Sequence, residues 1–336
     1  MAAERAVTVV VPAWNASRWL PGCLDALRAQ TYTDFSVVVV DSGSTDGCGD
    51  GLVDESLDLE VVRLAENRGF APAVNAGVRA ARSPYVALLN VDTRARPRWL
   101  EALVGCLEEL GPEVAGVSSK MLDMVHPGLI DDAGDSLSWY GSATKQGHGE
   151  PAETQTERRE IFSVSGGAAL YRRSFLAQVG FDPRYHSYFE DIDVGLRGRI
   201  RGYRFFFEPR AEVLHHGGGA GLGRGRYVTL VTRNRLMTFL KSIPGRLLFK
   251  HWHRLAWGQL YFFIAYKRPL HSLLGYLSLA RNLPHILEER RRLSRERVLS
   301  DAALDRLLGR ELGEPPLREL LLRRLRGRPG GAVGPP

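Results

Sequence analysis

Apolar residues in the first hundred positions follow two alternating patterns. Unbroken runs rich in β-branched residues, typical of buried parallel strands, occur at Val7–Val11, Val37–Val40, Glu60–Leu64 and Tyr85–Leu89. Stretches with helical periodicity separate these runs, at Ser17–Gln30, Ala71–Ala81 and Pro97–Leu110. The alternation predicts an α/β domain with a mainly parallel central sheet and flanking helices.

The middle of the chain is less regular. We expect further strands and helices at Val114–Met121, Ile161–Tyr171, Ser174–Val179, Glu190–Arg201 and Arg204–Phe207. The Gly- and Asp-rich stretch His126–Gly149 predicts a hairpin with loops, and the polar stretch Pro151–Glu160 predicts a mobile surface loop. The arginines at 197, 199, 201 and 204 are interpreted as a solvated face.

The character of the chain changes after about residue 216. Long helical stretches rich in Arg, Leu and aromatic residues extend to about residue 326, and the last ten residues are rich in Gly and Pro. We therefore expect an α/β domain over residues 1–216, a basic helical region over 217–326 and a disordered tail over 327–336.

Composition and charge narrow the class of protein. The 336 residues are 44% hydrophobic with a formal net charge of +7, which suits a folded protein with anionic partners. The three cysteines, Cys23, Cys48 and Cys106, form no disulfide framework, so a reducing compartment is expected. The start of the chain has no signal-peptide pattern, and the apolar stretch Leu255–Tyr266 is too short to span a bilayer. These features predict a cytoplasmic protein.

Polar clusters follow three of the predicted strands, at Pro12–Asn15, Asp41–Gly47 and Asn90–Thr93. Ligands of open α/β sheets bind at the carboxyl ends of the strands, so three converging clusters predict a binding site. The first strand is not followed by the glycine pattern of dinucleotide-binding enzymes, and the P-loop pattern is absent too. Asp92 is a hard oxygen ligand suited to Mg²⁺ or Mn²⁺, which in turn bridges phosphates.

At this point the sequence resembles glycosyltransferase family 2, whose members have the GT-A fold for binding nucleotide sugars. The segments that carry the resemblance are VTVVVPAWN (7–15), VVVVDSGSTDG (37–47), ENRGFAPAVNAGVRAA (66–81), LLNVDT (88–93), SGGAALYRRSFLAQVGFD (165–182), YFEDIDVGLRGRIRGYR (188–204) and HH (215–216). They occur in the family's order over roughly residues 7 to 240. Residues 166–234 most resemble bacterial rhamnosyltransferase-like enzymes of surface polysaccharide assembly.

The resemblance implies a set of donor-binding residues. They are Pro12, Ala13, Asn15, Asp41, Ser42, Asn67, Arg68, Gly69, Asn75, Asn90, Val91, Gly166 and Gly167. Within this set, Asp41 would recognise the pyrimidine base, Arg68 would lie near the diphosphate, and the two glycines 166 and 167 would form the floor of the sugar pocket. Asn90 replaces the first Asp of the family's D-x-D motif and would bind ribose or sugar without charge.

The resemblance also implies the metal and catalytic residues. Asp92 would hold Mg²⁺ or Mn²⁺, with either His215 or His216 completing the metal or diphosphate site. Glu190 and Asp191 would form the acceptor-side pair, with Asp191 as the base of an inverting transfer. Without the motif context, the same two acids would be ordinary residues of a helix N-terminus, where they meet the helix dipole favourably.

The expected activity is the transfer of a sugar from a nucleoside-diphosphate donor to a hydroxyl of a saccharide or lipid-linked saccharide acceptor. The subgroup favours dTDP-rhamnose as donor, with UDP-hexoses as the second choice. A sugar-phosphate nucleotidyltransferase is an alternative, but residues 12–20 lack the glycines that its triphosphate loop would need. A non-catalytic, membrane-associated scaffold with the same fold is a further alternative.

The basic and aromatic residues at 245–285 leave two interpretations open. Helices of this composition can lie in a membrane interface, which would make the protein peripheral on the inner face of the cytoplasmic membrane. The other interpretation is a helical bundle that packs on the catalytic domain or on a second copy in a homodimer. No nucleic-acid-binding motif accompanies the positive charge, so nucleic acid is not an expected partner.

Overall fold

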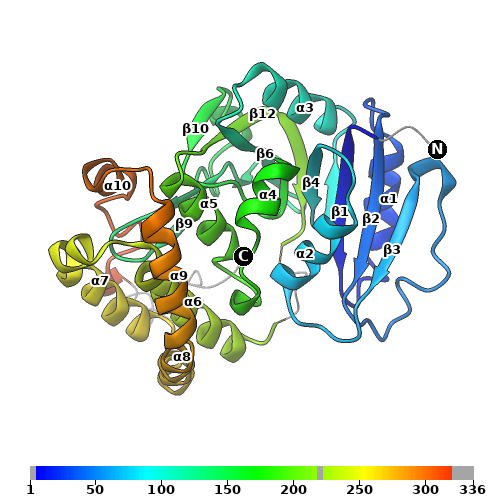
Figure 1. The fold of residues 1–336 in the computed structure, drawn as a ribbon. Helices are drawn as coiled ribbons and strands as arrows, with labels where there is room; N and C mark the ends of the chain where they lie inside the picture. The colour runs from blue at the N-terminus through cyan, green and yellow to red at the C-terminus, as the bar shows by residue number, and fades with distance from the viewer. Residues whose placement is uncertain (1–4, 218–221, 320–336) are drawn as a thin grey trace. The chain divides into compact units, whose positions relative to one another are not determined.

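The computed structural model describes residues 5–217 and 222–319, which form two compact units (Figure 1). The first unit comprises Met1–Asp135 and Lys145–Gly219, and the second comprises Ser136–Thr144 and Ala220–Pro336. The tail over 327–336, expected to be disordered, lies outside the described residues.

The first unit is built around a ten-stranded sheet. Its strands are β1 (Val7–Ala13), β2 (Phe35–Asp41), β3 (Leu59–Arg63), β4 (Tyr85–Leu89), β5 (Thr93–Ala95), β6 (Val114–Asp123), β7 (Ile130–Asp132), β10 (Arg159–Ile161), β11 (Ala168–Arg172) and β12 (Arg204–His215). The order is β10-β12-β6-β11-β4-β1-β2-β3, with β5 paired to β12 and β7 paired to β6.

Four of the seven neighbouring strand pairs along this order are parallel, which confirms the predicted mainly parallel sheet. β1 lies parallel to β2 and β4, β2 to β3, and β12 to β6, whereas β11 runs antiparallel between β4 and β6. The carboxyl ends of β1, β2 and β4 therefore meet at one edge of the sheet, and the amino end of β11 meets the same edge.

Helices cover both faces of this sheet. α1 (Leu20–Arg28) and α3 (Trp99–Glu109) pack on one face, while α2 (Phe70–Ala80) and α4 (Arg173–Val179) pack on the other. Each presents apolar residues at helical spacing to the sheet, which explains why the periodicity of the sequence predicted them. α5 (Glu190–Ile200) is buried along nearly its whole length.

The expected mobile loop over Pro151–Glu160 is partly wrong. Ala152–Thr154 forms a short 3₁₀ turn, and Arg159–Ile161 forms the edge strand β10 on β12. The segment has few apolar residues, but charged side chains hold it: Arg158 pairs with Glu208, and Glu160 pairs with Arg204. Electrostatic pairing thus supplies the order that apolar content could not predict.

Three further expectations differ from the structure. The strand expected over Ile161–Tyr171 is interrupted between β10 and β11, and the strand expected over Arg204–Phe207 continues to His215 through an irregularity between Glu208 and Glu212. The arginine series is no solvated face, because Arg197 is 2% exposed and pairs with Asp193. An inward-facing ion pair has the same sequence signature as a solvated one.

The second unit is helical. Its helices are α6 (Arg224–Ser242), α7 (Gly245–Ala265), α8 (Pro269–Arg281), α9 (Leu283–Glu296) and α10 (Asp301–Leu307), and it includes the tip of the hairpin formed by β8 (Asp135–Leu137) and β9 (Ala143–Lys145). Trp139 of this tip stacks on His251 of α7, with ring centroids 4.0 Å apart. Arg235 of α6 is buried over the Phe262 ring and donates to the Gly141 carbonyl. Aromatic rings and a cationic side chain thus pack together with the aliphatic residues in the core of this unit.

Candidate active site

The ends of β1 and β2 are held together by backbone and side-chain hydrogen bonds. Ala13 and Asp41 are register partners, and the Ser42 N–H donates to the Ala13 carbonyl at 2.9 Å. The Asp41 carboxylate is buried and accepts from the Ser44 N–H at 2.9 Å. Asn15, with a left-handed φ of 49°, accepts at its Oδ1 from the Thr45 N–H. Pro12 lies in the ladder opposite Val40.

The segment at 66–69 lies beside the loop that follows β2. A Cβ on Gly43, whose φ is +68°, would meet the Glu66 Cα at 2.8 Å, so the two backbones are in close contact there. The Asn67 side chain accepts from the Gly69 N–H, and Arg68 is exposed and pairs with Glu66. The candidate diphosphate residues therefore adjoin the candidate base-binding loop.

Asn75 has a different environment from the other predicted donor residues. Its Nδ2 donates to the Phe181 carbonyl at 2.6 Å, and its Oδ1 accepts from the Phe181 N–H at 3.1 Å. Both polar ends of this side chain therefore bind the chain's own backbone and tie α2 to the segment after α4.

The segment Asn90–Asp92 connects β4 to β5. The Asn90 N–H donates to the Gly167 carbonyl at 2.8 Å, and Val91 packs against the apolar core. Asp92 is 4% exposed, and its Oδ1 lies 3.6 Å from Nε2 of His215. This proximity follows from the sheet, because Thr93 and His215 are register partners of β5 and β12.

The two candidate histidines have different roles in the structure. The His215 ring lies beside the Asp92 carboxylate, whereas the His216 ring packs on Trp19 with centroids 4.4 Å apart. The His216 Nδ1 is hydrogen-bonded to the Gly217 carbonyl, and only its backbone N–H donates to the Asp92 carbonyl. Of the two side chains, that of His215 is therefore the better placed to share a ligand with Asp92.

Behind His215 lies a charged pair that the sequence analysis missed. The His215 Nδ1 is 2.8 Å from Oδ2 of Asp131, and Lys145 donates to the same carboxylate at 2.9 Å. Burial alone would lower the pKa of His215, but hydrogen bonds to Asp131 and Asp92 raise it to about 9. Burial opposes charge on Asp131 as well, yet His215 and Lys145 hold the pKa of that carboxyl well below its ordinary value.

The other two polar residues of the site, Glu190 and Asp191, begin α5. The Asp191 Oδ2 accepts from the Gly166 N–H at 3.4 Å and its Oδ1 from the Ile192 N–H at 2.7 Å. Burial raises the pKa of Asp191 above its ordinary value, although those two N–H groups favour the charged form. Burial and the charge of Asp191 raise the pKa of Glu190 well above its ordinary value too.

Consecutive glycines join the two halves of the site. The Gly166 N–H donates to the Asp191 carboxylate, and the Gly167 carbonyl accepts from the Asn90 N–H, so one peptide unit separates Asp191 from the segment that follows β4. A Cβ on Gly167 would lie 2.8 Å from Cε of Met121 and 3.4 Å from Nδ2 of Asn90. A side chain at 167 would therefore crowd the Asn90 amide.

The backbone just before Asp191 is held in an uncommon conformation. His186, Tyr188 and Phe189 all have left-handed φ values of 66°, 70° and 69°. Non-glycine residues rarely adopt this region, and runs of such residues cluster where the surrounding structure fixes a functional group. Gly69 has a φ of +96° and contacts His186, since a Cβ there would lie 2.3 Å from the His186 carbonyl oxygen. The strained turn thus packs against the candidate diphosphate loop.

Three buried polar groups near Asp191 were not predicted. The Asp132 Oδ2, the Asp135 Oδ2 and the Tyr171 hydroxyl are buried without a hydrogen-bond partner among the described residues. Burial raises the pKa of Asp132 to about 6, and burial together with Asp132 raises the pKa of Asp135 well above its ordinary value. The signal in the sequence was the D-D-x-G-D pattern at 131–135, which falls inside the stretch interpreted only as a hairpin with loops.

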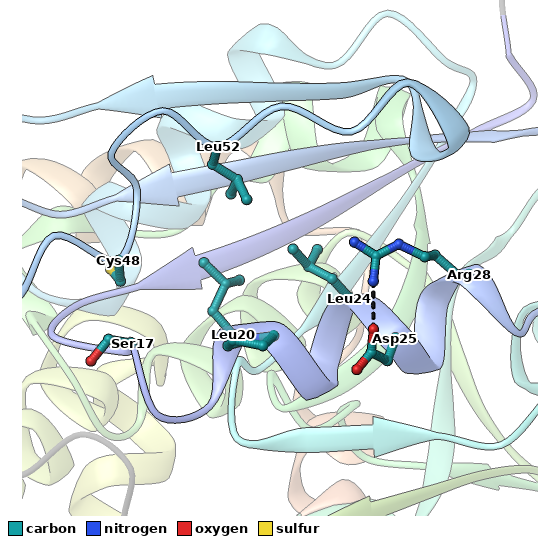
Figure 2. Close-up of a pocket in the computed structure, with 8 residues that line it drawn as sticks. Ser17, Leu20, Leu24, Asp25, Arg28, Cys48 and Leu52 are labelled. Carbon is teal, nitrogen blue, oxygen red and sulfur yellow. Dashed lines mark hydrogen bonds and ion pairs between the residues drawn. The ribbon is translucent and has the colours of Figure 1, made fainter.

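A pocket of about 330 Å³ opens elsewhere, between α1 and the loop after β2 (Figure 2). Leu20 and Leu24 of α1 face Leu52 across it, and Asp25 pairs with Arg28 at its rim. The residues predicted to bind donor, metal or acceptor are not among those that line it. Its apolar walls distinguish it from the polar cluster at the strand ends.

A metal ion at Asp92 would need ligands from outside the chain. Over residues 5–217 and 222–319, no three His, Cys, Asp or Glu side chains converge as a complete metal cage. Asp92 and His215 provide one carboxylate oxygen and one imidazole nitrogen within 3.6 Å of each other. Mg²⁺ and Mn²⁺ sites that act on nucleotides commonly take one or two protein ligands and complete their shell with phosphate oxygens and water. The residues present therefore fit such an ion in company with a diphosphate.

Comparison with known proteins gives a consistent result. Residues 8–180 match the family described as "Glycosyl transferase family 2". A Mycobacterium tuberculosis protein named N-acetylglucosaminyl-diphospho-decaprenol L-rhamnosyltransferase is 29% identical over 235 residues, which cover 62% of this chain and 75% of that protein. The Pre-mycofactocin glycosyltransferase of the same organism is 30% identical over 216 residues, covering 63% of this chain and 43% of its own length.

Solved structures share the fold. The mannosyltransferase PcManGT from Pyrobaculum calidifontis, in complex with GDP-Man and Mn²⁺, aligns with a TM-score of 0.51 at 19% identity and covers 84% of this chain and 76% of its own. GalNAc-T7 with UDP, GalNAc and Mn²⁺ aligns with a TM-score of 0.55 at 16% identity and covers 80% of this chain and 59% of its own. At these identities the likeness concerns the fold alone, and the expected fold is confirmed.

Proposed function

Because this chain belongs to glycosyltransferase family 2 and has the GT-A fold, it is a glycosyltransferase, and we propose that it is an inverting, metal-dependent one. In this proposal it moves a sugar from a nucleoside-diphosphate donor to a hydroxyl of a saccharide or lipid-linked saccharide. The observation that carries the proposal is the glycine pair 166–167, which lies between the Asn90–Asp92 segment and the Asp191 carboxylate. A donor sugar above these glycines would have its leaving group on one side and a base on the other.

The donor's nucleoside would bind at the ends of β1 and β2. Asp41 is buried there, and its carboxylate can accept from the imide N–H of a pyrimidine or from a ribose hydroxyl. The exposed guanidinium of Arg68 can reach a diphosphate, since its partner Glu66 is exposed and such a surface pair contributes little. Asn90 would bind ribose or sugar hydroxyls through its amide.

Asp92 and His215 would hold the divalent cation, either Mg²⁺ or Mn²⁺, with the ion taking the place of the proton that His215 Nε2 carries beside Asp92. When bound, the ion would act as a Lewis acid that stabilises the charge developing on the leaving diphosphate. Asp131 fixes the orientation of the His215 ring through Nδ1, so that Nε2 is directed toward Asp92. The complexes of PcManGT with GDP-Man and Mn²⁺ and of GalNAc-T7 with UDP and Mn²⁺ support this assignment by analogy of fold.

Asp191 would take the proton from the acceptor hydroxyl as its oxygen attacks the anomeric carbon. Attack from the side opposite the diphosphate would invert the configuration, and the position of the glycine pair 166–167 between Asp191 and Asn90 supports this proposal. Burial makes Asp191 a stronger base than a solvated carboxylate, because its raised pKa increases its affinity for the proton. The backbone N–H groups of Gly166 and Ile192 fix the orientation of the carboxylate.

The donor and acceptor are proposed from the relatives. A relative that is 29% identical over 62% of this chain is named as an L-rhamnosyltransferase of N-acetylglucosaminyl-diphospho-decaprenol. We therefore favour dTDP-rhamnose as the donor, a UDP-hexose as the second choice, and a lipid-linked saccharide of cell-surface polysaccharide synthesis as the acceptor. With such an acceptor, the enzyme would work in the cytoplasm as a peripheral protein on the inner face of the cytoplasmic membrane.

The first test is a thermal-shift panel of dTDP, UDP and GDP, each with and without Mn²⁺ or Mg²⁺. A ligand that binds only the folded state raises apparent stability by about 2.7 kcal/mol at about 100 times its Kd. We expect a shift with dTDP or UDP that requires the metal and is lost in Asp92→Ala. Asp50→Asn is the matched control, since Asp50 is exposed and pairs with Arg63 away from the metal ligands.

Two outcomes would contradict the proposal. If no nucleoside diphosphate shifts the folded protein, donor binding fails and a non-catalytic scaffold becomes the better account. If the shift occurs equally without metal and in Asp92→Ala, the transferase reading stands but its metal dependence does not. Product analysis with dTDP-rhamnose and UDP-glucose then identifies the sugar, and the anomeric configuration of the product tests inversion.

A further inference from the structure

The second unit carries an exposed apolar surface on the outer side of two helices. On α7, Phe249 and Trp252 are 81% and 62% exposed, and the other exposed apolar residues follow at helical spacing. The large exposed residues of the two helices are Phe249, Trp252, Trp257, Leu260 and Ile264 of α7 and Leu270, Leu273, Leu274 and Leu277 of α8. We call these nine residues the α7–α8 surface.

This surface is additional to the faces with which the two helices pack. The inward face of α7 buries Leu247, Tyr261 and Phe262, on the side opposite Phe249 and Leu260. The inward face of α8 is formed by Ser272, Gly275 and Leu279, of which Gly275 lies against α6. Each helix therefore packs within the second unit through one face and exposes a second apolar face. Exposed apolar faces of this kind mark interaction sites.

The charge of the region identifies the partner. The chain has 38 Asp and Glu among 336 residues, about one in nine, yet residues 213–287 contain none and include 11 Lys and Arg. Two of these eleven, Arg235 and Lys241, are buried, and two others, Arg246 and Lys250, pair with Asp301 and Asp305 of α10. Lys267 and Arg268 are exposed at the turn between α7 and α8, and Arg281 is exposed at the end of α8. A surface that binds a second copy of the chain gains nothing from excluding acids over this length. A surface that binds a polyanion benefits, because no carboxylate on it repels the negative charges of the partner.

We infer that the α7–α8 surface docks on an anionic lipid bilayer, with its aromatic and leucine side chains in the interface and its basic residues on lipid phosphates. Helices with an apolar face, Trp and Phe anchors and a basic border lie in the membrane plane in this way. Within the described residues, no helix has the length and apolarity to cross a bilayer. Nucleic acid would satisfy the charge but not the nine apolar side chains.

This inference names the surface through which the proposed peripheral protein would bind the membrane, and its biological purpose rests on the proposed function. Its test requires neither donor nor acceptor. The full chain is mixed with vesicles of phosphatidylglycerol and phosphatidylcholine, or of phosphatidylcholine alone, and the bound fraction is measured by flotation. We expect binding to the anionic vesicles to be at least tenfold stronger, and to weaken as salt rises.

Two variants separate the apolar from the electrostatic contribution. Phe249→Asn with Trp252→Asn should reduce binding to anionic vesicles at least tenfold, because both side chains leave the interface. Lys267→Glu with Arg268→Glu should remove the preference for anionic lipid. The matched control is Val53→Asn, since Val53 is 79% exposed in the first unit, far along the chain from this surface. The thermal-unfolding midpoint of each variant checks that it is folded.

Several results would overturn the inference. Equal vesicle binding by the wild type and the Phe249/Trp252 variant would do so, as would equal binding to neutral and anionic vesicles. Sedimentation velocity without lipid is the second readout: a dimer that the Phe249/Trp252 variant abolishes, in a protein that does not bind vesicles, would assign the surface to a second copy. A nucleoside-diphosphate thermal shift that persists in any of these cases would leave the transferase proposal intact.

Discussion

The two sides of the candidate active site treat their carboxylates in opposite ways. On the donor side, Asp131 lies between the cations of His215 and Lys145, which hold its pKa low and keep it charged. On the proposed acceptor side, Glu190 is buried and Asp191 is half-buried at the start of α5, where removal from water raises their pKa values. In the proposed mechanism, the same residue type is therefore a fixed charge on one side and a proton acceptor on the other.

The difference follows from what each side must stabilise. In the proposed mechanism, a leaving diphosphate and its cation need a ligand whose orientation is fixed, which the hydrogen bond from Asp131 to the His215 ring supplies. A general base needs an affinity for protons closer to that of its working pH, which desolvation supplies. The helix dipole of α5 favours negative charge at its N-terminus, but burial outweighs this effect for both acids.

The largest expected effect of a single substitution is that of Asp191→Asn. The amide retains the shape of the side chain but cannot take a proton, so kcat should fall by about 10²–10⁴-fold. Donor binding, measured by the thermal shift with nucleoside diphosphate and metal, should be nearly unchanged because Asp191 lies on the acceptor side. Asp193→Asn is an unsuitable control, since Asp193 pairs with the buried Arg197. A variant that retains more than a tenth of wild-type kcat would show that another group is the base.

Asp131→Asn should weaken metal binding by about 10–100-fold, the usual cost of losing an outer-shell partner of a histidine ligand. The substitution removes the charge that orients the His215 ring while preserving the size of the side chain. The measurement is the Mn²⁺ concentration that gives half of the nucleoside-diphosphate thermal shift. Lys145→Gln is the matched comparison, because it removes the other partner of Asp131 without touching His215. If Lys145→Gln has the larger effect, Asp131 does not act through the histidine.

Most of the fold could be predicted from the sequence, because most helices and strands are specified by patterns within their own segments. β1, β2 and β4 are unbroken apolar runs, and α2 and α3 have helical periodicity, so each element carries its own signal. The segment around β10 carried none, because ion pairs with β12 and α5 order it. Partners separated by some 40 residues leave no pattern within a window of the sequence.

The residues of the candidate site that could be predicted from the sequence also differ in this way from those that could not. Asp41, Asp92 and Asp191 could be predicted because they follow or begin regular elements inside recognisable motifs, although their roles are still predictions. Asp131 and Lys145 could not, since their importance depends on β7 lying beside β6 and on His215 ending β12. The choice between His215 and His216 also required the structure, because both residues follow the same strand and only the ring contacts distinguish them.

A pH profile tests the acceptor side without any substitution. Asp191 must be deprotonated to act as a base, and burial raises its pKa, so kcat at saturating substrate should fall as pH is lowered through a value above that of an ordinary aspartate, about 3.9. Below this value the rate should fall about tenfold per pH unit. The pH at which the rate falls depends on the charges near Asp191, which are those of Glu190, Lys145 and the buried acids Asp132 and Asp135. A rate that is constant down to about pH 4 would contradict the assignment of a buried base.

The smallest expected effect concerns stability, at Asp132. Its pKa is raised to about 6 by burial, so the folded state holds the proton more tightly than the unfolded state does. The stability that this contributes is fully present below the unfolded pKa of about 4 and is lost as pH rises through about 6. Asp132→Asn removes that titration while keeping an oxygen that can accept from the Gly134 N–H.

The variant should therefore unfold about 2–4 °C higher than the wild type at pH 8, the shift expected for about 1 kcal/mol in a unit of this size. At pH 4 the two proteins should unfold at similar temperatures, because Asp132 is then protonated and as neutral as asparagine. The measurement is the thermal midpoint of both proteins at the two pH values, with Asp50→Asn as an exposed control. A lower midpoint for Asp132→Asn at pH 8 would mean that Lys145 stabilises charged Asp132 more than burial destabilises it. Asp132 would then resemble Asp131, whose charge is held by ion pairs, rather than Asp191.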